Sequence, residues 1–297
     1  MRNRNSKFGT RHSGKPRPSF DFRVSIFVLL LTALFVAPAW AAWSFISSRG
    51  TASEKTSDGG LSLSPTATVP AGSILVIFAA TDNPTNTTSC TDTTFHSITL
   101  STGDTCTLVR ERTQGTTAAA GVTTSLWACD LTTDLTTGGT VTLNISSAVT
   151  AKAVALGEFT VAAGKTFDVS SDQTDSCGSG TDMTTTLDPS GTSVLQIKTG
   201  GVEGTTASCG TDNGMTTVGG TATSGGGAAS NIALAGRYNI SAGSVTHNYI
   251  CSDSRDFSTV HSALDEVDEG APPPAEPPLR RQVITRRGGQ PTLPAGR

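Results

Sequence analysis

The feature that most constrains the fold is a succession of short apolar segments, each bounded by residues that favour turns. Residues 74–80 (ILVIFAA) follow a Pro-Ala-Gly turn and are typical of a buried strand. Residues 141–145 alternate apolar and polar side chains, the period of a strand with one apolar face. Further strands are expected at residues 105–112, 122–129, 152–161, 194–197, 232–240, 245–251 and 258–267. The pattern predicts an all-β fold, a single jelly-roll-like β-sandwich.

The composition supports strands over helices. Threonine accounts for 49 of the 297 residues, and its branched Cβ favours extended backbone. Glycine adds 32 residues, whereas aromatic residues make up 5% and charged residues 15% of the chain. This mixture excludes a helical bundle, a coiled coil, a multi-span membrane protein and a nucleotide-binding α/β enzyme. It is typical of a secreted or particle-borne β protein.

The chain divides into three parts: residues 1–41, a β-sandwich domain at 42–267, and a tail at 268–297. Residues 24–37 form an apolar run of about 14 residues, shorter than the ~20 that span a bilayer. A basic segment precedes this run and Ala39-Trp40-Ala41 follows it, the order of a secretory signal peptide. An uncleaved membrane anchor and a start codon assigned too far upstream remain alternatives. The Pro- and Arg-rich tail is expected to be disordered.

Charge is distributed unevenly between these parts. The formal net charge is −3, but both ends are basic, so residues 24–275 hold 9 basic and 22 acidic side chains, a net charge of −13. A body this acidic repels nucleic-acid phosphates, which excludes nucleic acid as a partner. The tail contains two arginine pairs, Arg280-Arg281 and Arg286-Arg287. We expect these pairs either to bind an acidic surface, including that of a neighbouring copy, or to be solvated.

The cysteines point to an oxidising compartment. All six follow the expected cleavage site, and no two have the C-x-x-C spacing of a zinc or thioredoxin-type site. Up to three disulfides are expected, and a Cys90–Cys106 bridge closing one loop is the first pairing to consider; buried thiols are the alternative. The six candidates are Cys90, Cys106, Cys129, Cys177, Cys209 and Cys251.

Acidic residues suggest a metal site. Four carboxylates, Asp168, Asp172, Asp175 and Asp182, lie in a Gly-containing segment that is expected to form a loop. Calcium takes several oxygen ligands from a chain flexible enough to wrap around it, so this segment is the calcium candidate. The spacing does not match a helix-loop-helix calcium motif, and a solvated polar loop is the alternative. No other cofactor is expected.

Catalytic motifs are absent from the sequence: it has no G-x-S-x-G, H-E-x-x-H or P-loop signature. Glu158 and Glu203 each lie in or beside an apolar strand. Together they are a candidate carboxylate pair for glycoside cleavage, which needs two acids about 5–10 Å apart. Solvent exposure, or a structural role in bonding backbone amides or arginine, are the alternatives. No residue is therefore assigned as catalytic.

Several segments stand out in order over residues 42–267, namely 42–83, GDT at 103–105, LVRERT at 108–113, AAAGVTTSLW at 118–127, VTAKAVALGEFTVAAG at 149–164 and GVEG at 201–204. In sequence and in order they resemble a group of β-sandwich proteins encoded in bacteriophage and prophage structural gene clusters. These segments are strand and turn sequences, so the resemblance implies a fold and a virion setting and no chemistry. The export signal is an addition to that pattern.

The sequence therefore predicts a non-enzymatic structural or surface-adhesion module. We expect it outside the cell or in the cell envelope after export, or on a virion surface if phage-encoded. Expected partners are other virion or cell-surface proteins, surface glycans and further copies of the chain, with membrane contact only through an uncleaved N-terminal segment. A secreted carbohydrate-binding module is the alternative, and a glycan-active enzyme is a more remote one.

Overall fold

The computed structural model describes residues 43–84, 90–117, 120–204, 209–224 and 231–270. These residues form strands and turns without any helix, which confirms the all-β prediction. Within this described part, no helix could therefore cross a membrane. The expected signal or anchor segment at 1–41 and the tail from residue 271 onward lie outside the described residues.

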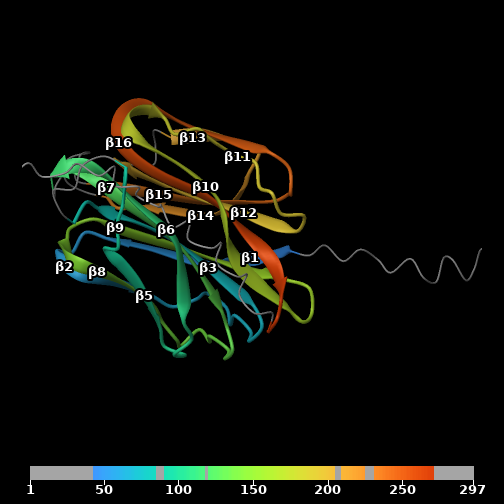
Figure 1. Ribbon diagram of the computed structural model, residues 1–297. Helices are drawn as coiled ribbons and strands as arrows, with labels where there is room; N and C mark the ends of the chain where they lie inside the picture. The colour runs from blue at the N-terminus through green and yellow to red at the C-terminus, as the bar shows by residue number, and fades with distance from the viewer. Residues whose placement is uncertain (1–42, 85–89, 118–119, 205–208, 225–230, 271–297) are drawn as a thin grey trace, which may run out of the picture. The chain divides into compact units, whose positions relative to one another are not determined.

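The strands form three antiparallel sheets (Figure 1). The central sheet has the order β1 (Ser44–Glu54), β9 (Lys152–Thr160), β3 (Ile74–Asp82), β7 (Ala120–Asp130), β6 (Cys106–Thr117) and β4 (Thr91–Asp92). The small sheet has the order β2 (Asp58–Leu63), β8 (Val141–Val149) and β5 (His96–Leu100). The large sheet has the order β10 (Lys165–Asp182), β16 (Val245–Asp268), β12 (Val194–Glu203), β15 (Ile232–Ile240) and β14 (Thr216–Ala222), while β11 (Thr185–Leu187) and β13 (Cys209–Asn213) pair with β16.

The central sheet packs against both of the others. Its strands β3, β7 and β9 contact β12, β14 and β15 of the large sheet. On its opposite face, apolar side chains of the small sheet join those of the central sheet in one hydrophobic cluster. The stack therefore has three layers, one more than the two-layered sandwich expected from the sequence. Strand patterns indicate how many strands exist, but they do not assign them to sheets.

Strand β3 lies in the middle of the central sheet and is covered on both faces. All nine of its residues are buried. Leu75, Ile77 and Ala79 face the small sheet and belong to its hydrophobic cluster, while the alternate residue Phe78 faces the large sheet next to Gly236. A strand covered on both faces needs apolar residues at every position. This explains the unbroken run at 74–80 and confirms that prediction.

Glycine lets the large sheet approach closely. A Cβ at Gly236 would lie 2.8 Å from the Phe78 ring, and a Cβ at Gly201 would lie 2.4 Å from the Thr124 side chain. Real Cβ atoms do not come this close to other heavy atoms, so any larger residue would push the two layers apart. The glycine-rich and alanine-rich sequences of β12 and β15 are therefore packing features of this interface.

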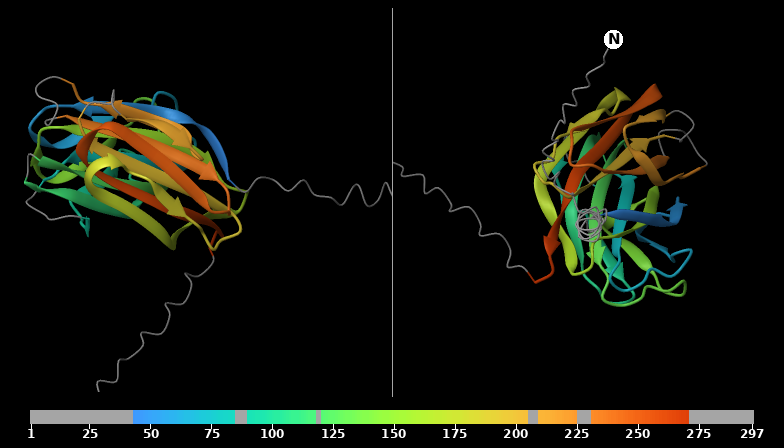
Figure 2. Two further views of the ribbon diagram at one scale, coloured as in Figure 1. Left: turned by 90° about the horizontal axis from the view of Figure 1, so that it is seen from above. Right: turned by 90° about the vertical axis from the view of Figure 1, so that its right-hand side faces the viewer.

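The central and large sheets are also linked along both of their margins. On one margin β1 runs beside β14 (Figure 2), where Ser53 Oγ donates to the Ala222 carbonyl at 2.9 Å and Thr221 Oγ1 donates to Ser53 Oγ at 3.2 Å. On the other margin β6, which pairs with β4, meets the edge strand β10. That second margin holds a concentration of charged side chains and a disulfide.

Candidate functional site: a clamp between two sheets

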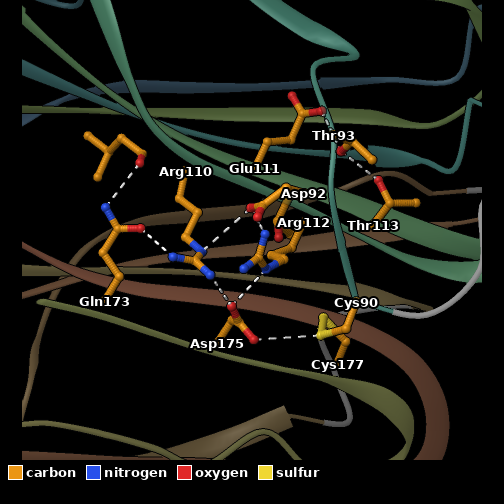
Figure 3. A network of polar contacts seen from close by, with 12 residues as sticks. Cys90, Asp92, Thr93, Arg110, Glu111, Arg112, Thr113, Gln173, Asp175 and Cys177 are labelled. Carbon is orange, nitrogen blue, oxygen red and sulfur yellow. Dashed lines mark hydrogen bonds and ion pairs between the residues drawn. A yellow bond between two sulfur atoms is a disulfide. The ribbon is translucent and has the colours of Figure 1, made fainter. Parts of the chain in front are cut away.

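The charged cluster is built from alternate residues of β6 and one residue of β10 (Figure 3). Arg110 and Arg112 share the face of β6 that looks toward the large sheet, because side chains two residues apart in a strand point the same way. Asp175 Oδ2 accepts from Arg110 Nη2 at 2.8 Å and from Arg112 Nε at 2.7 Å. One carboxylate thus binds two guanidinium groups across the gap between two sheets. We call this set, with Asp92, Gln173, Cys90 and Cys177, the clamp.

Two further side chains complete the polar contacts of the arginines. Asp92 of β4 forms an ion pair with Arg112 Nη1, and its Oδ1 lies 3.9 Å from Arg110 Nε. Gln173 Oε1 accepts from Arg110 Nη1 at 2.5 Å, while Gln173 Nε2 donates to the Ser170 carbonyl at 3.2 Å. The side chain of Asp92 is 78% exposed, against 22% for Asp175 and 7% for Arg112. Water therefore screens the Asp92 contact much more than the Asp175 contact.

A disulfide between Cys90, the residue before β4, and Cys177 of β10 ties the same two sheet margins together. The two residues are 87 positions apart in sequence with Cα atoms 5.4 Å apart. Cys90 has φ 55°, the one positive φ at a non-glycine residue of the described chain. Its Sγ lies 3.7 Å from Asp175 Oδ1, a contact without a hydrogen bond because a disulfide sulfur carries no proton. Covalent and ionic links thus meet at one point.

The cysteine pairing corrects the Cys90–Cys106 bridge considered from sequence. Cys106 instead bonds to Cys129, its register partner across β6 and β7. Cys251 is disulfide-bonded as well, and the register of β13 with β16 places Cys209 opposite it. Strand pairing, which brings distant residues together, decides the connectivity. The two bridges fit an oxidising compartment.

A second polar set lies between the central and small sheets. Glu111 accepts from the backbone N–H of Phe95 at 2.6 Å, the N–H of His96 at 2.9 Å and the Thr93 hydroxyl at 2.6 Å. The His96 ring has Ser125 Oγ at 2.8 Å from Nδ1 and Thr81 Oγ1 at 3.0 Å from Nε2. Burial lowers the pKa of His96 despite the nearby Glu111 carboxylate, so the ring is neutral near pH 7.

These residue types are those of a nucleophilic triad, but their arrangement differs from one. In a triad one imidazole nitrogen takes the hydroxyl proton while an acid orients the other nitrogen. Here Ser125 and Glu111 both approach Nδ1, the latter at 3.6 Å. Thr81, on the other nitrogen, donates its proton to the Asp82 carbonyl at 2.8 Å. All these side chains are at most 3% exposed, so the set acts as a hydrogen-bonded part of the core.

The four aspartates predicted to hold calcium do not form a loop. Asp168, Asp172, Asp175 and Asp182 lie along the edge strand β10, and Asp168 is the register partner of Asp265. Asp172 accepts from Ser190 N at 2.6 Å, and Asp182 accepts from Thr184 N at 2.8 Å; these bonds lower the pKa of both carboxyls. In the described ranges no group of three or more His, Cys, Asp or Glu residues is arranged to hold a metal.

The strand position suggests another role for these aspartates. Among the described strands β10 pairs only with β16, so it forms an edge of the large sheet. Charged side chains on an edge strand oppose pairing with a second sheet. The segment is rich in Ser, Gly and Asp because an edge strand needs little apolar surface.

The candidate carboxylate pair is also corrected. Glu158 is the register partner of Leu75, near the start of β3, whereas Glu203 is close enough to Asp82, at the end of β3, for that charge to raise its pKa. Seven residues of strand separate Leu75 from Asp82, about 23 Å. Two glycosidase carboxylates need to lie within about 10 Å of each other. Glu158 instead binds Arg49 and accepts from Ser73 Oγ at 3.0 Å, the structural alternative.

Comparisons with known proteins do not assign the chain to a family. No protein-family model, no curated protein and no solved structure matches the chain. Nothing in them links the chain to phage proteins. The function proposed below therefore rests on the contacts of this chain and on the sequence resemblance.

Proposed function

We propose that the chain is a non-enzymatic structural or adhesive module that acts by contact on a particle or cell surface. The observation that supports this most is the clamp, which joins the margins of two sheets through a disulfide and an aspartate shared by two arginines. On the opposite margin, Ser53 and Thr221 link β1 to β14. Closed margins of this kind resist shear between layers, a property suited to a protein that is loaded mechanically.

The use of the polar residues supports the same proposal. In the clamp and around His96, side chains of the types that serve in catalysis bond to each other and to the backbone. His96 and Glu111 are 3% and 2% exposed, so a substrate would have to separate two sheets to reach them. A reactive site needs the opposite, a polar group directed toward an accessible hollow.

The proposal also covers where the protein is located and from which fold it derives. An export signal at 1–41, followed by disulfide formation outside the cytoplasm, would place the protein in the cell envelope, the medium or a virion surface. We propose that the fold derives from the phage-type jelly-roll sandwich with one added layer. Its partners would be other surface or virion proteins, or further copies of the chain.

Glycan binding is a second candidate, favoured by the outer face of the small sheet. Ser62 Oγ bonds Thr142 Oγ1 at 2.8 Å, and Asn144 Nδ2 donates to Thr99 Oγ1 at 3.0 Å. This uncharged face of hydroxyl and amide groups has the hydrogen-bonding character of a sugar surface. Among the described residues, however, the exposed large hydrophobic side chains are Ile46, Ile240 and Ile250. None is an aromatic on which a sugar ring could stack.

The test is the physical state and activity of the oxidised, secreted full-length protein. Analytical ultracentrifugation should find multimers, or sedimentation with cell-envelope or virion particles, and polysaccharide assays should detect no new reducing ends. A monomer that cleaves polysaccharide would overturn the proposal. A glycan array separates the second candidate: binding that is lost in the Thr142→Lys variant would favour it over the first.

A further inference from the structure

The end of the interface between the central and large sheets contains an unusual row of polar side chains. Val122 of β7 is the register partner of both Gln114 on β6 and Asp82 on β3. Val122 faces the large sheet, because its Cγ2 would lie 2.8 Å from a Cβ at Gly201. Side chains directly opposite each other share a face. Gln114 and Asp82 therefore both look into the space between the two sheets.

Glu203 enters this space from the large sheet. It lies two residues after Gly201 on β12, so its side chain also faces the central sheet. Its carboxylate accepts from the backbone N–H of Gly121, the residue before Val122. Glu203 and Asp82 are each 7% exposed. Burial raises the pKa of both groups, that of Glu203 to about 7, and the negative charges of Asp256 and Asp82 add to the shift at Glu203.

Gln114 supplies an independent sign of a ligand. This residue is 8% exposed, and within the described part of the chain its Oε1 atom has no hydrogen-bond donor. Buried polar atoms are nearly always paired, so an unpaired amide oxygen on the sheet face that also carries Asp82 and lies toward Glu203 needs an explanation. Asp82 accepts from the backbone N–H groups of Ala151, at 2.8 Å to Oδ2, and of Thr150, and a carboxylate has further lone pairs with which to bind another group. Amide and carboxylate oxygens around one space are ligands for a hard cation.

We propose that Glu203, Asp82 and Gln114 bind a calcium ion between the central and large sheets. The two carboxylates supply two negative charges and Gln114 Oε1 supplies a neutral oxygen. Calcium accepts irregular sets of six to eight oxygens, whereas magnesium requires near-octahedral geometry and keeps most of its water, so the site selects calcium. The ion would tie together β3, β6 and β12. This site is separate from the Asp168–Asp182 strand and independent of the proposed contact function.

The test is calcium titration of the oxidised full-length protein after removal of metals with EDTA, at pH 7.5. Calorimetry should give saturable binding of one calcium ion, and the melting temperature should rise with calcium concentration, since a ligand that binds only the native state stabilises it. Magnesium at the same concentration should give a smaller shift. The absence of calcium binding by the wild-type protein would overturn the proposal.

Variants locate the site. Glu203→Gln keeps the shape of the side chain and Gln114→Met removes only the amide; each should weaken calcium binding at least about tenfold. Asp188→Asn is the matched control. Asp188 is an exposed residue directly after β11, so this variant should bind calcium as the wild type does. Unchanged affinity in both Glu203→Gln and Gln114→Met, or equal weakening in Asp188→Asn, would contradict the assignment. If Glu203→Gln does not fold, Gln114→Met alone decides.

Discussion

Arg112 and Asp175 belong to different sheets, and Arg112 Nε lies 2.7 Å from Asp175 Oδ2. The arginine side chain is 7% exposed and the aspartate 22%, so this ion pair is largely withdrawn from water. The same carboxylate binds Arg110. Asp175 thus supplies the less exposed of the two negative charges that offset these two cations, and Asp92 supplies the other.

Removing that charge should be costly. We predict that Asp175→Asn lowers the free energy of unfolding by roughly 3 kcal/mol, because two partly buried guanidinium groups lose their shared counter-charge. Asp92→Asn is the matched control: Asp92 binds the same arginines but is 78% exposed, so its loss should cost less than about 1 kcal/mol. Urea unfolding with the disulfides intact measures both values. Equal losses in the two variants would show that the clamp is an ordinary surface cluster.

The two bridges should differ in their contribution to stability. Cys90–Cys177 closes a loop of 87 residues and Cys106–Cys129 one of 23. From chain entropy alone, replacing both cysteines of the first by serine should cost about 4.6 kcal/mol, against about 3.4 kcal/mol for the second. Chemical denaturation of the two double variants measures the difference. A larger loss for the Cys106–Cys129 variant would contradict the prediction.

The sequence predicted the buried elements well, for physical reasons. A strand covered on both faces has to be apolar throughout, so residues 74–80 identified the central strand β3. Residues 232–240 match β15 in full. Regular alternation likewise identified β8, whose apolar residues face the central sheet.

Contacts between distant strands could not be predicted in the same way. Asp175 sits among Ser, Gly and Asp residues, which suggested a loop; the strand forms because β16 pairs with its backbone, whatever its side chains. The His96 set draws on β3, β5, β6 and β7 and leaves no spacing pattern in the chain. The pairing of Cys90 with Cys177 depends on how the layers stack, and a single sequence contains no signal for that.

The close approach of the layers is testable at Gly236. A Cβ there would lie 2.8 Å from the Phe78 ring, so Gly236→Ala should lower the free energy of unfolding by about 1–3 kcal/mol through overpacking. Gly243→Ala is the control, because the nearest atom to its added Cβ is 3.5 Å away on an exposed turn. Thermal unfolding of the two variants gives the comparison. Adding Phe78→Leu to Gly236→Ala should recover part of the loss, and equal stability of the two single variants would argue against the stacking.

The titration of Glu203 predicts how stability depends on pH without metal. Burial raises its pKa from 4.5 to about 7, so the native state binds a proton more readily than the unfolded chain. Stability conferred by the neutral carboxyl is present below about pH 4.5 and is lost as pH rises toward 7, on the order of 2–3 kcal/mol. Urea unfolding in EDTA across this range should show a slope that Glu203→Gln reduces. An unchanged slope in that variant would assign it to other groups.

Peptide mapping of the protein under non-reducing conditions tests most directly the claim that two sheets are bonded at their margin by a disulfide. The structure predicts peptides that join Cys90 to Cys177 and Cys106 to Cys129, with Cys251 joined to Cys209 and no thiol that reacts with iodoacetamide. A Cys90–Cys106 peptide, or a protein isolated with reactive thiols at Cys90 and Cys177, would contradict the account.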